Sequence, residues 1–176
     1  MRMTRNIEIK ARIESVEAIL PLVEAVADRG AVESVQDDVF FACPNGRLKL
    51  RVFAPDRGEL IFYRRADGPG PRESSYVVSP TGDPATLRSA LASACGEAGR
   101  VHKRRLLFHA GRTRIHLDRV ENLGDFLELE VVLGEGESAQ AGEAEALNLM
   151  RRLGIGPESL VPGAYVDLIR SGPATA

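Results

Sequence analysis

The sequence has no tryptophan, only two cysteines and few aromatic residues. Each of these scarcities argues against a class of function. Aromatic residues make up 5% of the 176 residues, which argues against binding by base stacking. Cys43 and Cys95 do not form a metal-binding spacing, so we expect reduced thiols in a cytoplasmic protein. The formal net charge is −2, whereas a nucleic-acid-binding domain is expected to be strongly basic.

Long hydrophobic runs are also missing. The longest are far shorter than the roughly 20 apolar residues that span a bilayer, so we expect no contact with a membrane. The N-terminal segment MRMTRNIEIKARIE is charged from its start, unlike a secretory signal. With 44% hydrophobic residues, the chain suits a single globular domain. We place it over residues 1–170, followed by a C-terminal tail at 171–176.

Seven segments alternate between polar and apolar residues, which is the pattern of a half-buried strand. They are residues 5–13, 47–52, 59–65, 72–78, 101–108, 112–120 and 126–133. Apolar residues at helical spacing predict three helices, from Val16 to near Gly30, after Asp83-Pro84, and over residues 138–153. We interpret residues 36–38 as a loop before Phe40-Phe41, and residues 160–169 as a final short strand or helix. This order predicts an α+β fold with a largely antiparallel sheet.

The polar faces of these strands carry far more basic than acidic residues. The bases are Lys10, Arg12, Arg47, Lys49, Arg51, Arg65, Arg72, Lys103, Arg105, Arg112 and Arg114; the acids are Glu8, Glu59, Asp118, Glu128 and Glu130. Solvated outer faces of amphipathic strands would explain this pattern. Alternatively, the charged faces line the inside of a barrel. Many like charges in such a lumen are unfavourable unless an anion fills it, and a polyanion with bound cations would satisfy both bases and carboxylates.

Several of these segments resemble motifs of one protein family. Residues 6–10, NIEIK, resemble the ExExK signature of the CYTH superfamily, also called the triphosphate tunnel metalloenzymes. Four further elements are similar and follow in the family order: RLKLR at 47–51 with YRR at 63–65, VHKRR at 101–105, IHLD at 115–118 with LGDFLELE at 123–130, and AYVDL at 164–168. Together they cover nearly the whole chain.

The resemblance implies an eight-stranded antiparallel β-barrel tunnel with flanking helices, which holds a triphosphate and depends on Mg²⁺ or Mn²⁺. The metal ligands that it implies are Glu8, Asp118, Glu128 and Glu130, since hard cations prefer carboxylate oxygens. The implied phosphate-binding residues are Lys10, Lys49, Arg51, Arg65, Lys103 and Arg105. Of these, Lys10, Lys103 and Arg105 are also expected to act in catalysis.

Two residues depart from the family motifs. Asn6 stands where the signature usually has its first Glu, and Ala164 stands where the closing motif usually has Ser. His116 shares a face with Asp118, where it would act as a general base or as a hydrogen-bonding residue of the tunnel wall. We expect Tyr165 to be a packing residue, whereas three residues either contact phosphate or face solvent: Arg72, Ser74 and Tyr76.

The leading functional hypothesis is a class IV adenylate cyclase-like reaction, in which ATP gives cyclic AMP and pyrophosphate. One alternative is a triphosphatase acting on inorganic, thiamine or nucleoside triphosphate, and another is a non-catalytic binder of polyphosphate or nucleotide. The expected partner is a small triphosphate-containing molecule, with no nucleic acid, and a homodimer is the oligomer to consider. The sequence leaves open the preferred triphosphate, the number and kind of metal ions, the oligomeric state and the physiological role.

Overall fold

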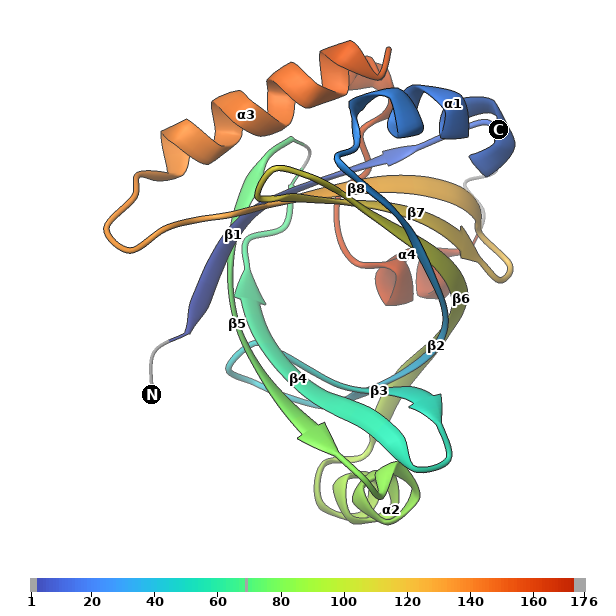
Figure 1. Ribbon diagram of the computed structural model, residues 1–176. Helices are drawn as coiled ribbons and strands as arrows, with labels where there is room; N and C mark the ends of the chain where they lie inside the picture. Colours follow the sequence, from blue (N-terminus) through green and yellow to red (C-terminus); the bar gives the residue numbers. More distant parts are fainter. Residues whose placement is uncertain (1–2, 69, 173–176) are drawn as a thin grey trace.

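The computed structural model describes residues 3–68 and 70–172, and these residues form a closed barrel with helices around it (Figure 1). The strand order around the barrel is β1-β5-β4-β3-β2-β6-β7-β8, and every neighbouring pair is antiparallel. The strands are β1 (Thr4–Arg12), β2 (Arg29–Phe41), β3 (Arg47–Ala54), β4 (Arg57–Arg65), β5 (Arg72–Thr81), β6 (Glu97–Ala110), β7 (Thr113–Val120) and β8 (Gly124–Val132). The predicted antiparallel barrel is thereby confirmed. Residues 173–176 of the predicted tail lie outside the described residues.

The apolar faces of the strands point outward, under the helices. In β1, Ile7, Ile9 and Ala11 are almost completely buried and belong to a core cluster shared with helices α1 (Val16–Val26) and α3 (Ala139–Arg152). These two helices lie side by side over one wall of the barrel (Figure 1). The main hydrophobic core therefore lies between barrel and helices. This arrangement leaves the charged faces for the interior.

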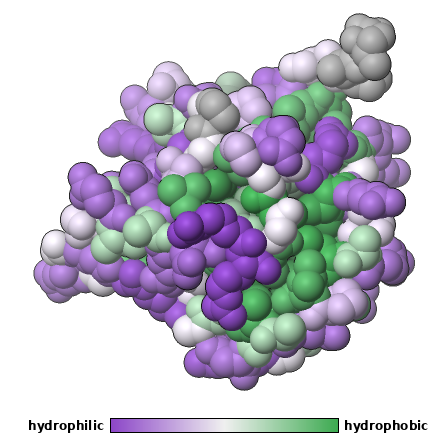
Figure 2. Space-filling model, turned by 90° about the horizontal axis from the view of Figure 1, so that it is seen from above, coloured by the Kyte–Doolittle hydropathy of each residue, from purple (hydrophilic) through white to green (hydrophobic). Residues whose placement is uncertain are grey.

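Figure 2 views the molecule from above, onto the side where α1 and α3 lie, and shows hydrophobic surface bordered by hydrophilic residues. None of the helices in the described residues is long and apolar enough to cross a membrane.

Helix α2 (Pro84–Cys95) covers a second part of the barrel wall. It begins as predicted, because the side chain of Asp83 accepts a hydrogen bond from the Thr86 backbone N–H at 3.0 Å, with Pro84 in the first turn. Its Leu87 and Leu91 pack against buried residues of β2 and β3. This contact holds the β2–β3 side of the barrel in place.

The C-terminal segment forms the short helix α4 (Tyr165–Ser171), preceded by a 3₁₀ turn at Pro157–Ser159. Of the two predictions for this segment, helix is therefore correct and strand is wrong. Tyr165 and Val166 pack against Val101 and Phe126, near the end of the barrel where β8 begins. The backbone of Gly99 lies so close to α4 that a Cβ at this position would be 2.5 Å from the side chain of Val166.

Two sequence-based expectations about the first part of the chain are wrong. Residues 36–38 form no loop, because they lie within β2, the strand missing from the seven predicted. Its inward-facing residues Ser34, Gln36 and Asp38 are polar as in the other strands, but Asp37 stands between Val35 and Val39 on the other face, so the sequence shows no regular polar–apolar alternation. Helix α1 also ends at Val26, before Gly30, because β2 already begins at Arg29.

Candidate active site inside the barrel

The barrel encloses a cavity of about 850 Å³, to which all eight strands contribute side chains. Ala164 and Tyr165, at the start of α4, line one end. The opposite end, where β3 ends and β4 begins, has a mixed rim, in which apolar Val32, Phe53, Val78, Pro80 and Leu107 lie beside charged Glu33, Arg57 and Glu59. Val32 is 61% exposed and Val78 is 39% exposed. Charged residues are thus buried deep inside the barrel, which reverses the arrangement of an ordinary apolar core.

Nine of the ten predicted site residues line this cavity: Glu8, Lys10, Lys49, Arg51, Arg65, Lys103, Arg105, Glu128 and Glu130. The tenth, Asp118, is completely buried behind them and contacts Lys103 and Arg105. The structure thus brings all ten together, as expected from inward-facing polar strand faces.

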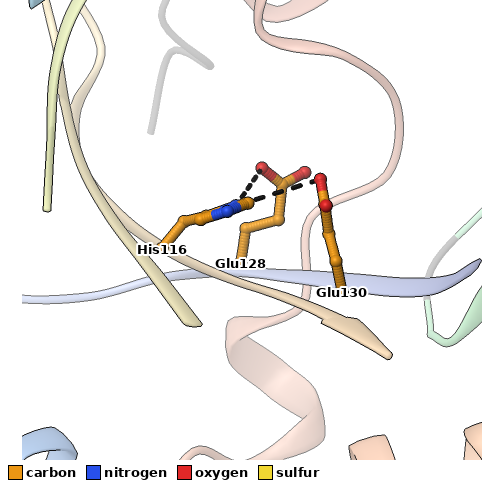
Figure 3. A group of neighbouring side chains, drawn as sticks. All are labelled: His116, Glu128 and Glu130. Atoms are coloured by element: carbon orange, nitrogen blue, oxygen red, sulfur yellow. Dashed lines mark ion pairs between the residues drawn. The ribbon is translucent and has the colours of Figure 1, made fainter. Parts of the chain in front are cut away.

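A group of three possible ligands, His116, Glu128 and Glu130, lies on the β7–β8 wall (Figure 3). Each offers one ligand atom, and these atoms all lie within 4.8 Å of one another. The Nδ1 atom of His116 is 3.6 Å from Glu128 and 3.9 Å from Glu130. The group forms because the two glutamates lie two residues apart on β8, and His116 is directly opposite Glu128 on β7.

The charge state of this group suits a divalent cation. Burial alone would raise the pKa of Glu128, but Lys10, with Nζ 3.5 Å away, holds it well below its usual range. Burial, followed by the charge of Arg105, lowers the pKa of His116, so its ring is neutral at pH 7. Within the described part of the chain, the buried Nδ1 atom has no hydrogen-bond partner. The two carboxylates are oxygen ligands of the kind that Mg²⁺ and Mn²⁺ prefer, and the His116 ring lies beside them.

The bases on β6 are held by Asp118. Arg105 donates to both of its carboxylate oxygens at 2.6 and 2.5 Å, and Lys103 donates at 3.1 Å. The Tyr165 hydroxyl also donates to Asp118, at 2.9 Å. Asp118 is therefore surrounded by donors and stands apart from the His116 group. Arg105 connects the two, since it also donates to Glu128 at 2.9 Å.

The same arrangement occurs on the adjoining β2–β3 wall. Asp38 lies directly opposite Arg51 and accepts two hydrogen bonds from its guanidinium and one from Lys49, all at 2.8 Å. Asp38 was not predicted as a site residue. Its signal in the sequence is the inward alternation of Gln36, Asp38 and Phe40, which becomes visible only when β2 is recognised as a strand.

Two further ion pairs lie in the cavity. Arg65 forms an ion pair with Glu8, and Arg114 bonds Glu130 at 2.6 Å and the Tyr76 hydroxyl at 3.0 Å. The buried Oδ1 of Asn6 is one of several side-chain atoms of the cavity that have no hydrogen-bond partner among the residues that the structure describes. This acceptor is therefore available to a ligand in the cavity.

Tyr165 does more than the packing role predicted for it. Its ring lies edge-on to Phe126, with 4.9 Å between the centroids. The ammonium groups of Lys10 and Lys103 lie 3.8 and 5.0 Å from the ring centroid. Cation–π contacts and the bond to Asp118 thus let one aromatic residue hold both lysines at the α4 end of the cavity. Its position in the AYVDL motif is the signal that pointed to it.

The protonation of Lys103 gives a first testable prediction. Burial, followed by the charge of Arg105, lowers its pKa to about 7, so much of it is neutral at pH 8 in the ligand-free protein. A bound polyphosphate favours the ammonium form, and binding of metal-free tripolyphosphate at pH 8 should therefore take up protons. Calorimetry in two buffers of different ionisation enthalpy measures this uptake. The Lys103→Arg variant, whose side chain is always charged, should take up fewer protons by as much as one per site; equal uptake would contradict the prediction.

Comparison with known proteins places this site in a family. The family profile of the CYTH domain matches residues 4–165. The PH1012 protein from Pyrococcus horikoshii OT3 is similar in structure, with a TM-score of 0.83 and 25% sequence identity over 93% of this chain and 98% of that chain. A proposed adenylate cyclase from Vibrio parahaemolyticus matches with a TM-score of 0.73 and 18% identity, over 97% and 99% of the two chains. HpAC1 from Hippeastrum has a TM-score of 0.64 and 16% identity, over 94% and 95%. No curated protein matches the chain.

The structure is a closed antiparallel tunnel with a charged interior. The matched profile spans nearly the whole of this barrel, and the chain belongs to the CYTH family. The tunnel enzymes of this family depend on a divalent metal, and the His116 group is the acidic site in this chain that fits one.

Proposed function

We propose that the protein is a metal-dependent enzyme acting on an organic triphosphate, with a class IV adenylate cyclase-like reaction as its leading activity. The observation that carries this proposal is the single cavity in which the His116 group faces buried, preoriented bases. A polyanion with a divalent cation complements both sets of charges.

In this proposal each wall of the tunnel has its own task. Lys10, Lys49, Arg51, Arg65, Lys103 and Arg105 bind the phosphate oxygens. Glu128 and Glu130, with His116, hold Mg²⁺ or Mn²⁺, while the metal-binding roles of Glu8 and Asp118 stay predictions. When bound, the cation supplies charge neutralisation on the phosphates and a lowered pKa for the attacking oxygen. The positions of Lys10, Lys103 and Arg105 let them neutralise charge that develops on the phosphates during transfer.

The exposed apolar residues of the rim support an organic triphosphate over a bare inorganic one. Exposed Val32 and Val78 lie at the opening of a cavity whose interior is charged. A substrate with a polyphosphate at one end and a ring system at the other would bury this rim, and burying apolar area contributes about 25 cal/mol per Å². Inorganic tripolyphosphate would leave the rim in water.

Two reactions are compatible with such a tunnel. In the cyclase reaction the ribose 3′-hydroxyl attacks the α-phosphorus of ATP, and pyrophosphate leaves. In the triphosphatase reaction water attacks the terminal phosphorus, and orthophosphate leaves. The Vibrio parahaemolyticus protein supports the first as a proposed adenylate cyclase. HpAC1 from Hippeastrum supports the second, since its structure is described with a dominant triphosphatase activity.

A product assay tests the proposal. The protein is incubated with ATP, and separately with tripolyphosphate, at saturating Mn²⁺ or Mg²⁺. Cyclic AMP with pyrophosphate identifies a cyclase, and orthophosphate identifies a triphosphatase. If neither product forms, and tripolyphosphate still raises the melting temperature, the chain is a binder and the enzymatic proposal is wrong.

Asn6 leads to a prediction about metal affinity. It is 2% exposed and offers a neutral oxygen where the family signature has a carboxylate. We expect the wild type to bind one metal ion firmly and a second only with substrate. Asn6→Glu should raise the metal affinity of the ligand-free protein and weaken binding of metal-free tripolyphosphate, because it adds a negative charge to the tunnel.

Calorimetric titration of both proteins with Mn²⁺ measures this change. Asn6→Asp is the companion variant, since it adds the same charge on a shorter side chain. Equal metal affinities in all three proteins would show that position 6 does not face the metal.

A further inference from the structure

Asp38 is a buried carboxylate of the tunnel that the proposed reaction does not use. It is 2% exposed and accepts hydrogen bonds from two bases: Arg51 through Nε and Nη2, and Lys49 through Nζ. It does not belong to the His116 group. Arg51 and Lys49 both line the cavity, so Asp38 contacts two groups that are placed to meet phosphate.

The contact geometry leaves both bases free for a ligand. A guanidinium has five N–H donors and an ammonium has three, and Asp38 accepts one bond from each of three nitrogens. Although burial alone raises its pKa, Arg51 and Lys49 hold the pKa of Asp38 well below the usual range. Asp38 thus remains ionised and holds the two side chains at fixed angles.

The arrangement is repeated on the adjoining β6–β7 wall. On β3 and on β6, a Lys and an Arg two residues apart share one Asp that lies directly opposite the Arg on the adjacent strand. In both copies the Arg donates through Nε and Nη2 and the Lys donates to Oδ2. An incidental ion pair would not need the same register and the same donor atoms twice.

We propose that Asp38 is a positioning residue for the triphosphate, which orients Lys49 and Arg51 at the expense of ground-state affinity. This inference rests on the proposed function of the tunnel. A fixed carboxylate beside the phosphate site repels the anionic substrate, which lowers affinity. The same carboxylate prevents the side chains of Lys49 and Arg51 from reorganising during the reaction. Asp38 therefore acts through Arg51 and Lys49, in a tunnel where the substrate itself is anionic.

Asp38→Asn removes the charge and keeps the size of the side chain. We expect metal-free tripolyphosphate to bind about tenfold more tightly, because a buried negative charge has gone. We also expect kcat with ATP and Mn²⁺ to fall about 10–100-fold while KM falls too, because the bases are no longer held at the productive angle. Asp38→Glu restores the charge and should return tripolyphosphate affinity toward the wild-type value.

Asp37→Asn is the matched control. Asp37 precedes Asp38 on β2 and makes a similar two-bond pair with Arg100, at 2.7 and 2.6 Å, outside the cavity lining. The Asp37→Asn variant should have the tripolyphosphate affinity, kcat and KM of the wild type.

The outcomes separate the inference from the proposed function. If wild-type protein binds tripolyphosphate and Asp38→Asn binds it equally or more weakly, Asp38 is a structural ion pair and the inference is wrong. A lower melting temperature with unchanged KM leads to the same conclusion. If the wild type itself binds no tripolyphosphate, the proposed function fails. Should Asp38→Asn not fold, the steady-state kinetics of Asp38→Glu decide. A positioning role requires the KM of this variant to stay near the wild-type value while its kcat falls.

Discussion

Replacing Glu128 or Glu130 with Ala is expected to lower turnover at least about a hundredfold while the barrel stays folded. Both carboxylates belong to the His116 group, and Glu128 also bonds Arg105 and pairs with Lys10. Removing either takes away one of the two charges that would hold the cation. The core is untouched, because these side chains point into the cavity and the apolar residues of β8 point outward.

Steady-state rates over a range of Mn²⁺ concentrations test this expectation, with circular dichroism to confirm the fold. A matched control is Glu73→Ala, since Glu73 is also a strand glutamate paired with an arginine, Arg5, but is not part of the cavity lining. That variant should keep wild-type rates. If Glu128→Ala or Glu130→Ala keeps near-normal activity at low Mn²⁺, its assignment to the metal site is wrong.

The barrel was predictable from the sequence because period-two alternation reports which residues share a face. In β1, Glu8 and Lys10 alternate with Ile7 and Ile9, and the structure places them on opposite faces. Alternation does not tell which face is inside, since a polar face suits solvent as well as a ligand cavity. The resemblance to the tunnel family resolved that ambiguity, and the buried charges of the structure confirm it.

The pairing between strands could not be predicted in the same way. His116 is a neighbour of Glu128 only because β7 and β8 pair in one particular register, which depends on turn geometry and on packing against α1 and α3. The family resemblance grouped Asp118 with the glutamates; the register adds that it lies opposite Arg105, and its metal-binding role stays a prediction. Asp38 was missed because its whole strand, β2, shows a mixed polar pattern.

Arg105 is expected to contribute both to tripolyphosphate binding and to the stability of the ligand-free protein, and the two contributions can be measured separately. It bridges Asp118 and Glu128 at the centre of the cavity, so its guanidinium lies between both halves of the site. Arg105→Ala is expected to weaken tripolyphosphate binding by about 2–4 kcal/mol, or roughly 30–1,000-fold, because the lost contacts are desolvated. It should also lower the free energy of unfolding of the ligand-free protein, since Asp118 keeps only Lys103 and Tyr165 as partners.

The double variant Arg105→Ala with Asp118→Ala distinguishes the two effects. Removing both members of a buried ion pair is much less destabilising than removing one, so the double variant should recover most of the lost stability in chemical denaturation. Its affinity for tripolyphosphate should stay well below that of the wild type, because the phosphate-binding guanidinium is still missing. If calorimetry instead shows that affinity returns together with stability, Arg105 serves only to neutralise Asp118, and the phosphate contacts must come from the remaining bases of the tunnel.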